Sequence, residues 1–439
     1  MKVLLVGGGA REHALALALA KNPDTELYAV AHNRNPGIAR IAKDYLLEKE
    51  TNADKIAEWA KSKGVKMAVV GPEAPLEAGV TDKLTAAGID CASPSKKAAE
   101  IETSKQFMRK LMVKYKIPGS VKCEVFDGAR DARKYIESLG AVAVKPIGLT
   151  GGKGVRVSGD HFKDTDGAMD YVKEILSKGI GGTKVLIEEK LEGEEFTIQA
   201  FCDGKEIYPM PAVQDHKRLL DGDKGPNTGG MGSYTQEDGL LPFLGRSDYE
   251  DAACILQKIV EALDEDGRTY VGPIYGQFML TARGPKVIEV NARFGDPEAM
   301  NVLSLLRSDY TDICHAMASG KLSKATIRFS RKASVCKYVV PEGYGIKPLA
   351  DYEIKVDEKA VEEAGARLFY ASVNEKDGKI YTTRSRSIAV LAMDDTISEA
   401  NRVCEKALKS ISGKIFVRHD IATKELLEKR IRHMKEIVG

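Results

Sequence analysis

Residues 215–232 read DHKRLLDGDKGPNTGGMG. This stretch holds five glycines, three aspartates and three basic residues but only three apolar side chains, which indicates a long loop that builds no core. Ordered loops of this length are usually functional, and the alternative is disorder. Strand-like runs at residues 196–202, 207–213 and 274–280 surround the loop and favour the ordered form. Backbone N–H groups and cations on a rigid scaffold are suited to an anionic substrate.

The composition is ordinary for a globular protein of several domains. The chain has 439 residues, of which 43% are apolar and 30% charged, and about two to four domains are expected at this length. A net charge of +2 argues against nucleic acid as a partner. Seven scattered cysteines without metal-ligand spacing favour reduced thiols in a cytoplasmic protein. No apolar run near the start approaches the roughly 20 residues that span a membrane, so we expect no membrane partner. We also expect a monomer or a small homo-oligomer.

The N-terminal region alternates between expected strands and helices. A helical pattern at residues 11–21 lies between the first two strands. Strands that alternate with helices indicate a parallel sheet. We therefore expect an α/β domain over residues 1–103. The expected strands are residues 3–6, 27–31, 66–71 and 89–92.

The remaining chain divides near residue 324. A helix expected at residues 96–114 leads into a small α+β unit at about residues 120–190, within a second domain of residues 104–323. The last domain, residues 324–439, has a mostly antiparallel α+β pattern and no catalytic constellation. Its expected strands and helices are residues 333–340, 366–373, 379–384, 388–392, 396–409 and 423–435.

A glycine-rich turn follows the first expected strand, where Gly7, Gly8 and Gly9 precede Arg11, Glu12 and His13. Backbone amides at such a helix start can bind phosphate. A dinucleotide site is disfavoured, because Glu12 replaces the third glycine of the fingerprint and no acid ends the second strand. A mononucleotide or sugar-phosphate site is favoured, and a purely structural turn is the alternative. Loops at residues 33–37 and 71–76 are expected at the same edge of the sheet.

A second glycine loop, residues 148–154, follows a strand that ends at Lys145. It is not a P-loop, because Lys153 is followed by glycine and then by a strand. A flexible flap over phosphate fits this pattern, and a plain hairpin is the alternative. Lys105 strengthens the phosphate interpretation. Residues 187–195 are rich in charge, which is typical of a solvated strand end but also of a hinge that binds adenine and ribose.

Polar residues alternate with apolar ones in residues 287–291, so Glu289 and Asn291 are predicted to share one face of a strand. Oxygen ligands in this arrangement are suited to Mg²⁺ together with substrate phosphates. Gln277, on a neighbouring strand segment, is a possible third ligand. A solvent-facing polar stripe is the alternative. Arg293 follows closely and could grip a carboxylate with two hydrogen bonds.

These motifs occur in the order seen in the phosphoribosylamine–glycine ligases, a family of the ATP-grasp superfamily. The chain resembles this family from residue 1 to about residue 321, most specifically at residues 71–76, 214–232 and 291–298. The resemblance implies an N-terminal α/β domain, an ATP-grasp core with a small mobile lid, and a C-terminal domain. It also implies ATP and Mg²⁺ or Mn²⁺, with glycine and phosphoribosylamine as small-molecule substrates.

The resemblance implies roles for particular residues. Metal is expected at Gln277, Glu289 and Asn291, and catalysis at Lys145, Lys153, Asp215 and Arg293. ATP is expected to contact Lys105, Lys145, Gly151, Gly152, Lys153, Gly154, Glu188, Glu189, Lys190, Leu191 and Glu195. The other substrates are expected to contact Gly9, Arg11, Glu12, His13, Asn35, Pro36, Gly37, Pro72, Glu73, Asp215, Lys217, Arg218, Gly229, Gly230, Arg293, Gly295 and Asp296.

The reaction implied is ATP-dependent joining of glycine to phosphoribosylamine through glycyl phosphate, in de novo purine biosynthesis. The chain departs from the family at residues 32–37, at Thr103 and at residues 145–148, which bears on substrate contacts rather than on the reaction class. Alternatives are another ATP-grasp carboxylate–amine ligase, an oxidoreductase that uses the N-terminal sheet, and a nucleotide-binding protein without catalysis.

Overall fold

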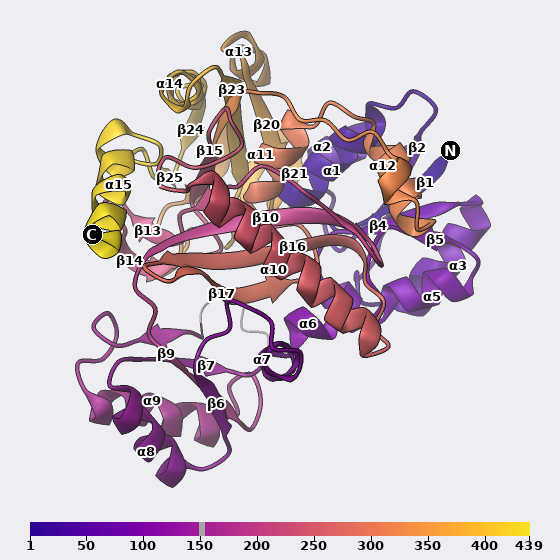
Figure 1. The fold of residues 1–439 in the computed structure, drawn as a ribbon. Coiled ribbons are helices and arrows are strands. Elements are labelled where there is room, and N and C mark those ends of the chain that lie inside the picture. Colours follow the sequence, from indigo (N-terminus) through magenta and orange to yellow (C-terminus); the bar gives the residue numbers. More distant parts are fainter. Residues whose placement is uncertain (149–153) are drawn as a thin grey trace.

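A computed structural model describes residues 1–148 and 154–439 (Figure 1). The first part of the chain is a sheet with the order β3-β2-β1-β4-β5, in which every neighbouring pair is parallel. Residues 3–6 are fully buried, as expected for a strand inside a parallel sheet. The predicted α/β class of this part is confirmed. The elements are β1 (Lys2–Val6), α1 (Ala10–Ala20), β2 (Glu26–Ala31), α2 (Pro36–Ile41), β3 (Asp44–Leu47), α3 (Ala53–Lys63), β4 (Met67–Val70), α4 (Glu73–Glu77), α5 (Val80–Ala86) and β5 (Asp90–Cys91).

The central part is built on an antiparallel sheet with the order β11-β10-β16-β17. The long strands β10 and β16 pair from Glu194 opposite Leu280 to Asp203 opposite Val271. Helix α10 packs against this sheet (Figure 1). The elements are α6 (Glu100–Thr103), α7 (Lys105–Lys114), β10 (Glu194–Asp203), β11 (Ile207–Pro209), α10 (Arg246–Glu265), β16 (Val271–Thr281), β17 (Gly284–Asn291), α11 (Glu298–Leu305), α12 (Tyr310–Ala318) and η1 (Leu322–Lys324).

A small unit hangs below the central sheet in Figure 1. It is a sheet with the order β6-β9-β7-β8, covered by two helices, and we call it the lid. Its apolar residues form a cluster separate from the core that the rest of the molecule shares. A unit with its own core can move as a body relative to its neighbours. The elements are β6 (Cys123–Phe126), α8 (Ala129–Leu139), β7 (Val142–Pro146), β8 (Arg156–Val157), α9 (Thr165–Lys178) and β9 (Val185–Glu189).

The C-terminal region is mostly antiparallel, as predicted. Its larger sheet, with the order β12-β15-β18-β23-β20, includes two strands from before residue 236. Strand β15 pairs with β18 from Gly232 opposite Lys337 to Thr235 opposite Ser334. The elements are β12 (Gln214–Asp215), β13 (Arg218–Leu220), β14 (Lys224–Asn227), β15 (Gly232–Thr235), β18 (Ala333–Pro341), β19 (Glu353–Val356), α13 (Glu358–Glu363), β20 (Ala366–Tyr370), β21 (Val373–Lys376), β22 (Lys379–Thr382), β23 (Ile388–Asp394), α14 (Ile397–Leu408), β24 (Ile411–Gly413), β25 (Ile415–Val417) and α15 (Lys424–Val438).

Three expectations about local structure were wrong. Residues 215–232 are not a plain loop: β13 and β14 form a hairpin, and Leu219 and Met231 are buried in the core. The helix expected at residues 96–114 is broken at Ser104, whose extended backbone ends α6 and whose hydroxyl accepts the Phe107 N–H to cap α7. The strand expected at residues 366–373 is divided between two sheets.

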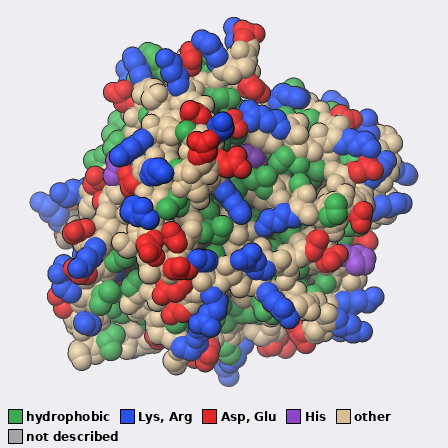
Figure 2. All heavy atoms as spheres, turned by 90° about the horizontal axis from the view of Figure 1, so that it is seen from above, with side chains coloured by type: hydrophobic (Ala, Val, Ile, Leu, Met, Phe, Trp, Pro, Cys, Tyr) green, Lys and Arg blue, Asp and Glu red, His purple; other side chains and the backbone are tan. Residues whose placement is uncertain are grey.

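Acidic and basic side chains are interspersed over the face shown in Figure 2, without a large area of one charge sign. None of the helices in residues 1–148 and 154–439 combines the length and the apolar character that a bilayer crossing needs.

Candidate active site

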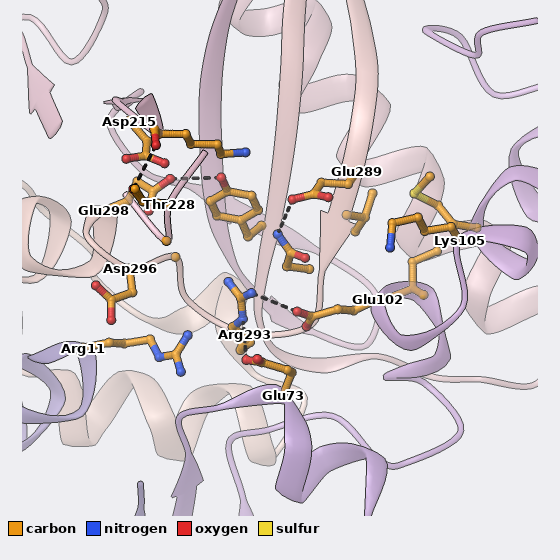
Figure 3. A pocket seen from close by; sticks show the side chains of 18 of the residues that line it. Arg11, Glu73, Glu102, Lys105, Asp215, Thr228, Glu289, Arg293, Asp296 and Glu298 are labelled. Carbon is orange, nitrogen blue, oxygen red and sulfur yellow. Dashed lines mark hydrogen bonds and ion pairs between the residues drawn. The ribbon is translucent and has the colours of Figure 1, made fainter. Parts of the chain in front are cut away.

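A polar cavity of about 300 Å³ lies where the three parts of the chain meet (Figure 3). Strand β17 supplies Glu289 and Asn291 at its carboxyl end, and α1 supplies Arg11 from the N-terminal part. The loop 215–232 supplies the opposite wall. The residues that line the cavity include Arg11, Glu73, Glu102, Lys105, Asp215, Lys217, Thr228, Gly229, Tyr275, Glu289, Asn291, Arg293, Gly295, Asp296, Glu298 and Arg386.

Two carboxylates lie together on one side of the cavity, Asp215 and Glu298 (Figure 3). Asp215 Oδ1 is buried and has no hydrogen-bond partner among the described residues. Glu298 Oε1 accepts the Tyr275 hydroxyl at 2.9 Å. Burial raises the pKa of both carboxyls, and the negative charge of Glu298 raises that of Asp215 further. Such a pair favours a ligand that brings a positive charge.

Glycine residues keep the space beside this pair open. Gly230 has a φ of +106°, and a Cβ there would lie 2.7 Å from Asp215 Oδ1 and 2.7 Å from Pro297 Cδ. A Cβ at Gly295 would lie 2.4 Å from Glu298 Oε2. Gly230 and Gly295, which were both expected to contact substrate, therefore bring the backbone close to the carboxylates of Asp215 and Glu298.

The floor of the cavity is a network of arginines and carboxylates. Arg293 lies between Glu102, with Nη2 2.9 Å from Oε1, and Glu73, with Nε 3.4 Å from Oε2 (Figure 3). Arg11 Nη1 donates to the Phe294 carbonyl at 3.1 Å, and Arg11 Nε lies 2.6 Å from Glu12 Oε1. Although burial raises the pKa of Glu73, the guanidinium groups of Arg293 and Arg11 lower it to about 2. The network therefore holds both guanidinium groups at the cavity.

The metal ligands expected on β17 share one face. Asn291 Nδ2 lies 3.5 Å from Glu289 Oε1, so the predicted shared face is confirmed. Burial raises the pKa of Glu289, but Lys217, Lys105 and Lys145 together hold it below its usual value. An ionised carboxylate beside an amide, open to a polar cavity, fits a divalent cation. Gln277 Oε1 already accepts the Lys217 ammonium at 2.6 Å, so a cation would compete for this third oxygen.

The expected ATP-binding side chains join the lid to the central part. Lys105 Nζ donates to the Gly148 carbonyl at 3.0 Å. Lys145 Nζ lies 2.6 Å from Glu188 Oε2, and Arg109 Nε lies 2.6 Å from Glu188 Oε1. Burial raises the pKa of Glu188, but these two cations lower it to about 2. The two oxygens of the Glu188 side chain are thus both engaged in ion pairs.

The other expected ATP contacts among the described residues do not line the central cavity. Glu195 accepts the Gln277 amide N–H, Glu189 Oε1 accepts the Lys122 N–H at 2.9 Å, and Lys190 Nζ donates to the Ser158 carbonyl at 2.9 Å. Glu189, Lys190 and Leu191 together border a separate cavity, which residues of α15 also line. Gly154 accepts the Tyr171 hydroxyl through its carbonyl at 2.7 Å. The expected flap residues Gly151, Gly152 and Lys153 lie outside the described residues.

The N-terminal loops form a second cavity of about 270 Å³, which is lined by Gly9, Glu12 and Pro72 among others. Glu12 Oε2 accepts the Gly9 N–H at 2.8 Å, so a carboxylate occupies the amide that was expected to meet phosphate. His13 is buried and its Nδ1 accepts the Tyr370 N–H at 2.9 Å. Asn35 Nδ2 donates to the Tyr370 carbonyl at 2.8 Å.

The side chains of His13 and Asn35 therefore fasten the N-terminal part to the C-terminal part. Pro36 begins α2, and Gly37 leaves room for the His13 ring, with which an added Cβ would collide. Of the N-terminal residues expected to contact substrate, only Arg11 and Glu73 line the central cavity.

The last domain, in which the sequence shows no catalytic constellation, brings one side chain to the cavity, that of Arg386. Arg386, between β22 and β23, donates through Nη1 to the carbonyls of Gly229 and Gly230, and its Nη2 lies 3.0 Å from Asp296 Oδ2. Tyr338 donates its hydroxyl to Asp296 Oδ1. The only signal in the sequence was a polar run, residues 382–387, between two apolar strands. Lys217 lines the cavity, whereas Arg218 pairs with Asp160 of the lid at 2.6 Å.

Comparisons with known proteins identify the class of fold and the family. The phosphoribosylglycinamide synthetase ATP-grasp (A) domain matches residues 103–299, the N domain residues 1–102 and the C domain residues 334–424. A biotin carboxylase domain from Hydrogenobacter thermophilus shares the fold, with a TM-score of 0.75, 17% identity and coverage of 99% of this chain and 97% of that chain. The fold and the site thus define an ATP-grasp enzyme.

Close relatives narrow the class. Phosphoribosylamine–glycine ligase of Methanothermobacter thermautotrophicus is 52% identical over 439 residues, covering 100% of both chains. That of Methanosarcina acetivorans is 53% identical over 441 residues, covering 100% of this chain and 98% of its own. The crystal structure of phosphoribosylamine–glycine ligase from Thermotoga maritima has a TM-score of 0.81 and 26% identity, covering 96% of this chain and 100% of that chain. The chain belongs to the phosphoribosylglycinamide synthetase family.

Proposed function

We propose that the chain joins glycine to 5-phosphoribosylamine at the expense of ATP and forms glycinamide ribonucleotide, ADP and phosphate in de novo purine biosynthesis. The observation that carries the proposal is the pair of buried carboxylates Asp215 and Glu298, in the same cavity as Glu289 and Lys105. Asp215 Oδ1 has no hydrogen-bond partner in the part of the chain that the structure describes. A small ammonium compound fits the first pair, and nucleotide phosphate with a divalent cation fits the second.

Asp215 and Glu298 would hold the glycine ammonium group, and Arg293 would orient its carboxylate. Arg293 suits this task because Glu73 and Glu102 hold its guanidinium plane at the cavity. The carboxylate oxygen would then attack the γ-phosphorus of ATP, so that the bond to the ADP oxygen breaks and glycyl phosphate forms. In glycyl phosphate the leaving group on the glycine carbonyl carbon is phosphate, whereas in free glycine it would be an oxide.

Lys105, Lys145 and Lys153 would neutralise negative charge on the phosphates during the transfer. Glu289 and Asn291, with Gln277 as a weaker third candidate, would hold a divalent cation, Mg²⁺ or Mn²⁺, which supplies further charge neutralisation when bound. Lys145 is paired with Glu188 in this structure at 2.6 Å, so its charge is partly compensated before ATP arrives.

Phosphoribosylamine would approach from the N-terminal loops. Its amine attacks the carbonyl carbon of glycyl phosphate, phosphate leaves, and an amide bond forms. Glu12 is suited to the hydroxyls of the sugar rather than to its phosphate, because it is a carboxylate at the Gly9 amide. No protein nucleophile takes part. Gly9, Arg11, Pro72, Glu73, Lys217, Gly229, Gly295 and Asp296 remain proposed contacts.

The division into residues 1–103, 104–323 and 324–439 remains a proposal, as do a cytoplasmic location and a monomer or small oligomer. Turnover of ATP would distinguish a ligase from a nucleotide-binding protein without catalysis. The identity of the second substrate would distinguish this ligase from other ATP-grasp ligases.

The test measures ADP release with glycine and freshly made phosphoribosylamine, each omitted in turn, with Mg²⁺ or Mn²⁺. Turnover should need both compounds. With ¹⁸O in the glycine carboxylate, one labelled oxygen should appear in the released phosphate. Formation of AMP and pyrophosphate, or of unlabelled phosphate, would rule out this mechanism.

A further inference from the structure

The last helix, α15, lies against the central sheet and carries two nitrogen-bearing side chains, Arg430 and His433, that contact other parts of the chain. It packs on β10 and β16, with Leu426 and Met434 buried beneath it. Arg430 and His433 are three residues apart and therefore share a face of the helix. Residues elsewhere on α15, such as Lys424, Arg432 and Lys435, are exposed. One polar face of the helix is thus turned toward the body of the molecule.

The first inward contact is at the base of the lid. Residues 190–193, the hinge segment, connect β9 of the lid to β10, and Glu194 is the first residue of β10. The Glu194 side chain is 4% exposed, and its two oxygens take Arg430 Nη1 at 2.9 Å and His433 Nδ1 at 2.6 Å. A buried carboxylate needs such partners. The end of the hinge segment is therefore fastened to α15.

The second inward contact is at the hairpin of β13 and β14, residues 218–227, which we call the substrate hairpin. Asp223 lies in its turn with a φ of +60°. Asp223 Oδ2 takes Arg430 Nη2 at 2.5 Å, and Asp223 Oδ1 takes Arg418 Nη2 at 3.1 Å. His216 Nδ1 and Lys429 Nζ lie 3.6 and 3.7 Å from this carboxylate.

The substrate hairpin leads directly to the cavity. The Thr228 N–H donates to the Lys217 carbonyl at 2.7 Å, and the Met231 N–H donates to the His216 carbonyl at 2.7 Å. These bonds join the two arms of the loop next to Asp215. A movement of the turn at Asp223 would therefore move the hydrogen-bonded segments that flank the hairpin, and with them the carboxylate of Asp215.

One guanidinium group consequently touches both segments. We propose that Arg430 is a positioning residue that couples the hinge of the lid to the substrate hairpin, so that closure of the lid on nucleotide sets the position of Asp215. The guanidinium group is planar and its donors have a fixed geometry, so movement of Glu194 either moves Asp223 or breaks an ion pair. The inference rests on the proposed function, because it assigns glycine to Asp215 and ATP to the lid.

The test compares three variants with a matched control. Arg430→Gln removes the bridge. Arg430→Lys keeps the charge beside Glu194 but cannot serve both carboxylates at once. Asp223→Asn removes the negative charge at the hairpin end of the bridge, where Arg418 also binds, and leaves the pair of Arg430 with Glu194 in place. Arg432→Gln is the control, since Arg432 is an exposed arginine on the same helix that makes no ion pair among the described residues.

The first measurement is amide hydrogen exchange of residues 218–227 with and without Mg²⁺ and a non-hydrolysable ATP analogue. Nucleotide should slow exchange in the substrate hairpin of the native chain and of Arg432→Gln, and this response should be lost in all three variants. Arg430→Lys should melt near the native temperature even if Arg430→Gln unfolds, because its ammonium still neutralises Glu194. A hairpin that does not respond to nucleotide in the native chain overturns the inference.

The second measurement is steady-state kinetics. Loss of the bridge should lower kcat/KM for glycine by about tenfold in Arg430→Lys and Asp223→Asn, while KM for ATP stays near its native value in Asp223→Asn. Full native kinetics in Arg430→Lys would show that charge neutralisation suffices and would overturn the inference. Absence of glycine-dependent ADP release in the native chain would instead overturn the proposed function, and the exchange measurement would still stand.

Discussion

Asp215 has a buried oxygen that no side chain or backbone group of the described residues satisfies. We predict that Asp215→Asn raises KM for glycine by about ten- to a hundredfold, because a charge-assisted hydrogen bond to the ammonium group is lost. KM for ATP should change little. Steady-state kinetics checks this, with Asp312→Asn, an exposed aspartate on α12, as the control. An unchanged glycine KM would remove Asp215 from the site.

The same carboxylates should release protons when glycine binds. Burial raises the pKa of Asp215 and of Glu298 in the protein without ligand, and the negative charge of Glu298 raises that of Asp215 further. An ammonium group favours their ionised forms, so binding lowers both pKa values and protons leave over the pH range between the usual and the raised values. Titration calorimetry in buffers of different ionisation enthalpy measures this release. Proton uptake, or no exchange of protons, would contradict the assignment.

Glu289 is the residue on which metal binding should depend. Glu289→Gln should lower turnover by at least about a hundredfold, because the charge that holds the cation is lost. Thermal melting without ligand should change little, since Glu289 faces the cavity rather than the core. Titration of activity with Mg²⁺ checks the prediction against Glu250→Gln on the exposed side of α10. Near-normal activity at saturating Mg²⁺ would exclude this carboxylate as a ligand.

Some of the cavity could be read from local patterns, and some could not. The period of two in β17 predicted that Glu289 and Asn291 share a face, because that geometry belongs to a single strand. Arg386 could not be predicted, because tertiary packing alone brings it to Gly229 and Asp296. The helix-start pattern at Gly9 suggested phosphate, but the Glu12 carboxylate reaches its amide first.

At the scale of an element, the turn that carries Gly230 is limited by space. Gly230→Ala should cost about 1–3 kcal/mol of stability from strain at positive φ and should also abolish glycine binding, because the new methyl group would lie 2.7 Å from Asp215 Oδ1. Gly88→Ala is a matched control: its φ is +80°, but no atom lies within 4 Å of the new Cβ. Chemical denaturation and glycine kinetics on both variants separate strain from crowding. Normal glycine KM in Gly230→Ala would contradict the proposed site.

The short strands could not be predicted from the sequence. β13 and β14 have three and four residues, too few for alternation to stand out. Their pairing depends on distant groups: Arg418, which is fully buried, donates to the Arg218 carbonyl at 3.0 Å. By contrast, the helix α1 and the apolar strands of the first sheet were visible in the sequence, because their pattern is local.

At the scale of the whole molecule, buried histidines should make the fold sensitive to acid. Burial lowers the pKa of His13 from 6.5 to about 4. In this pH range the unfolded chain binds a proton at His13 and the folded chain does not. The free energy of unfolding therefore has its full value above the unfolded pKa and decreases as the pH falls from 6.5 to 4. The loss is about 3 kcal/mol. Urea unfolding at several pH values checks it. His13→Gln should flatten the decline, whereas His32→Gln, an exposed histidine, should not.

The division into three parts could be predicted only in outline. Strand–helix alternation marked the first part, and the change in texture near residue 324 marked the last. The sequence could not show that β15 and β18 pair, since they lie about a hundred residues apart and each strand satisfies its own pattern.

This shared sheet has a consequence for how the chain can change. The seam between the central and C-terminal parts is a row of backbone hydrogen bonds and not a loose linker. Exchange of the last part for that of a relative would therefore have to preserve the register at Gly232, where a Cβ would lie 2.4 Å from the Cys336 carbonyl. Exchange of the whole C-terminal part between relatives during evolution is thus restricted, and we expect the central and C-terminal parts to have diverged together.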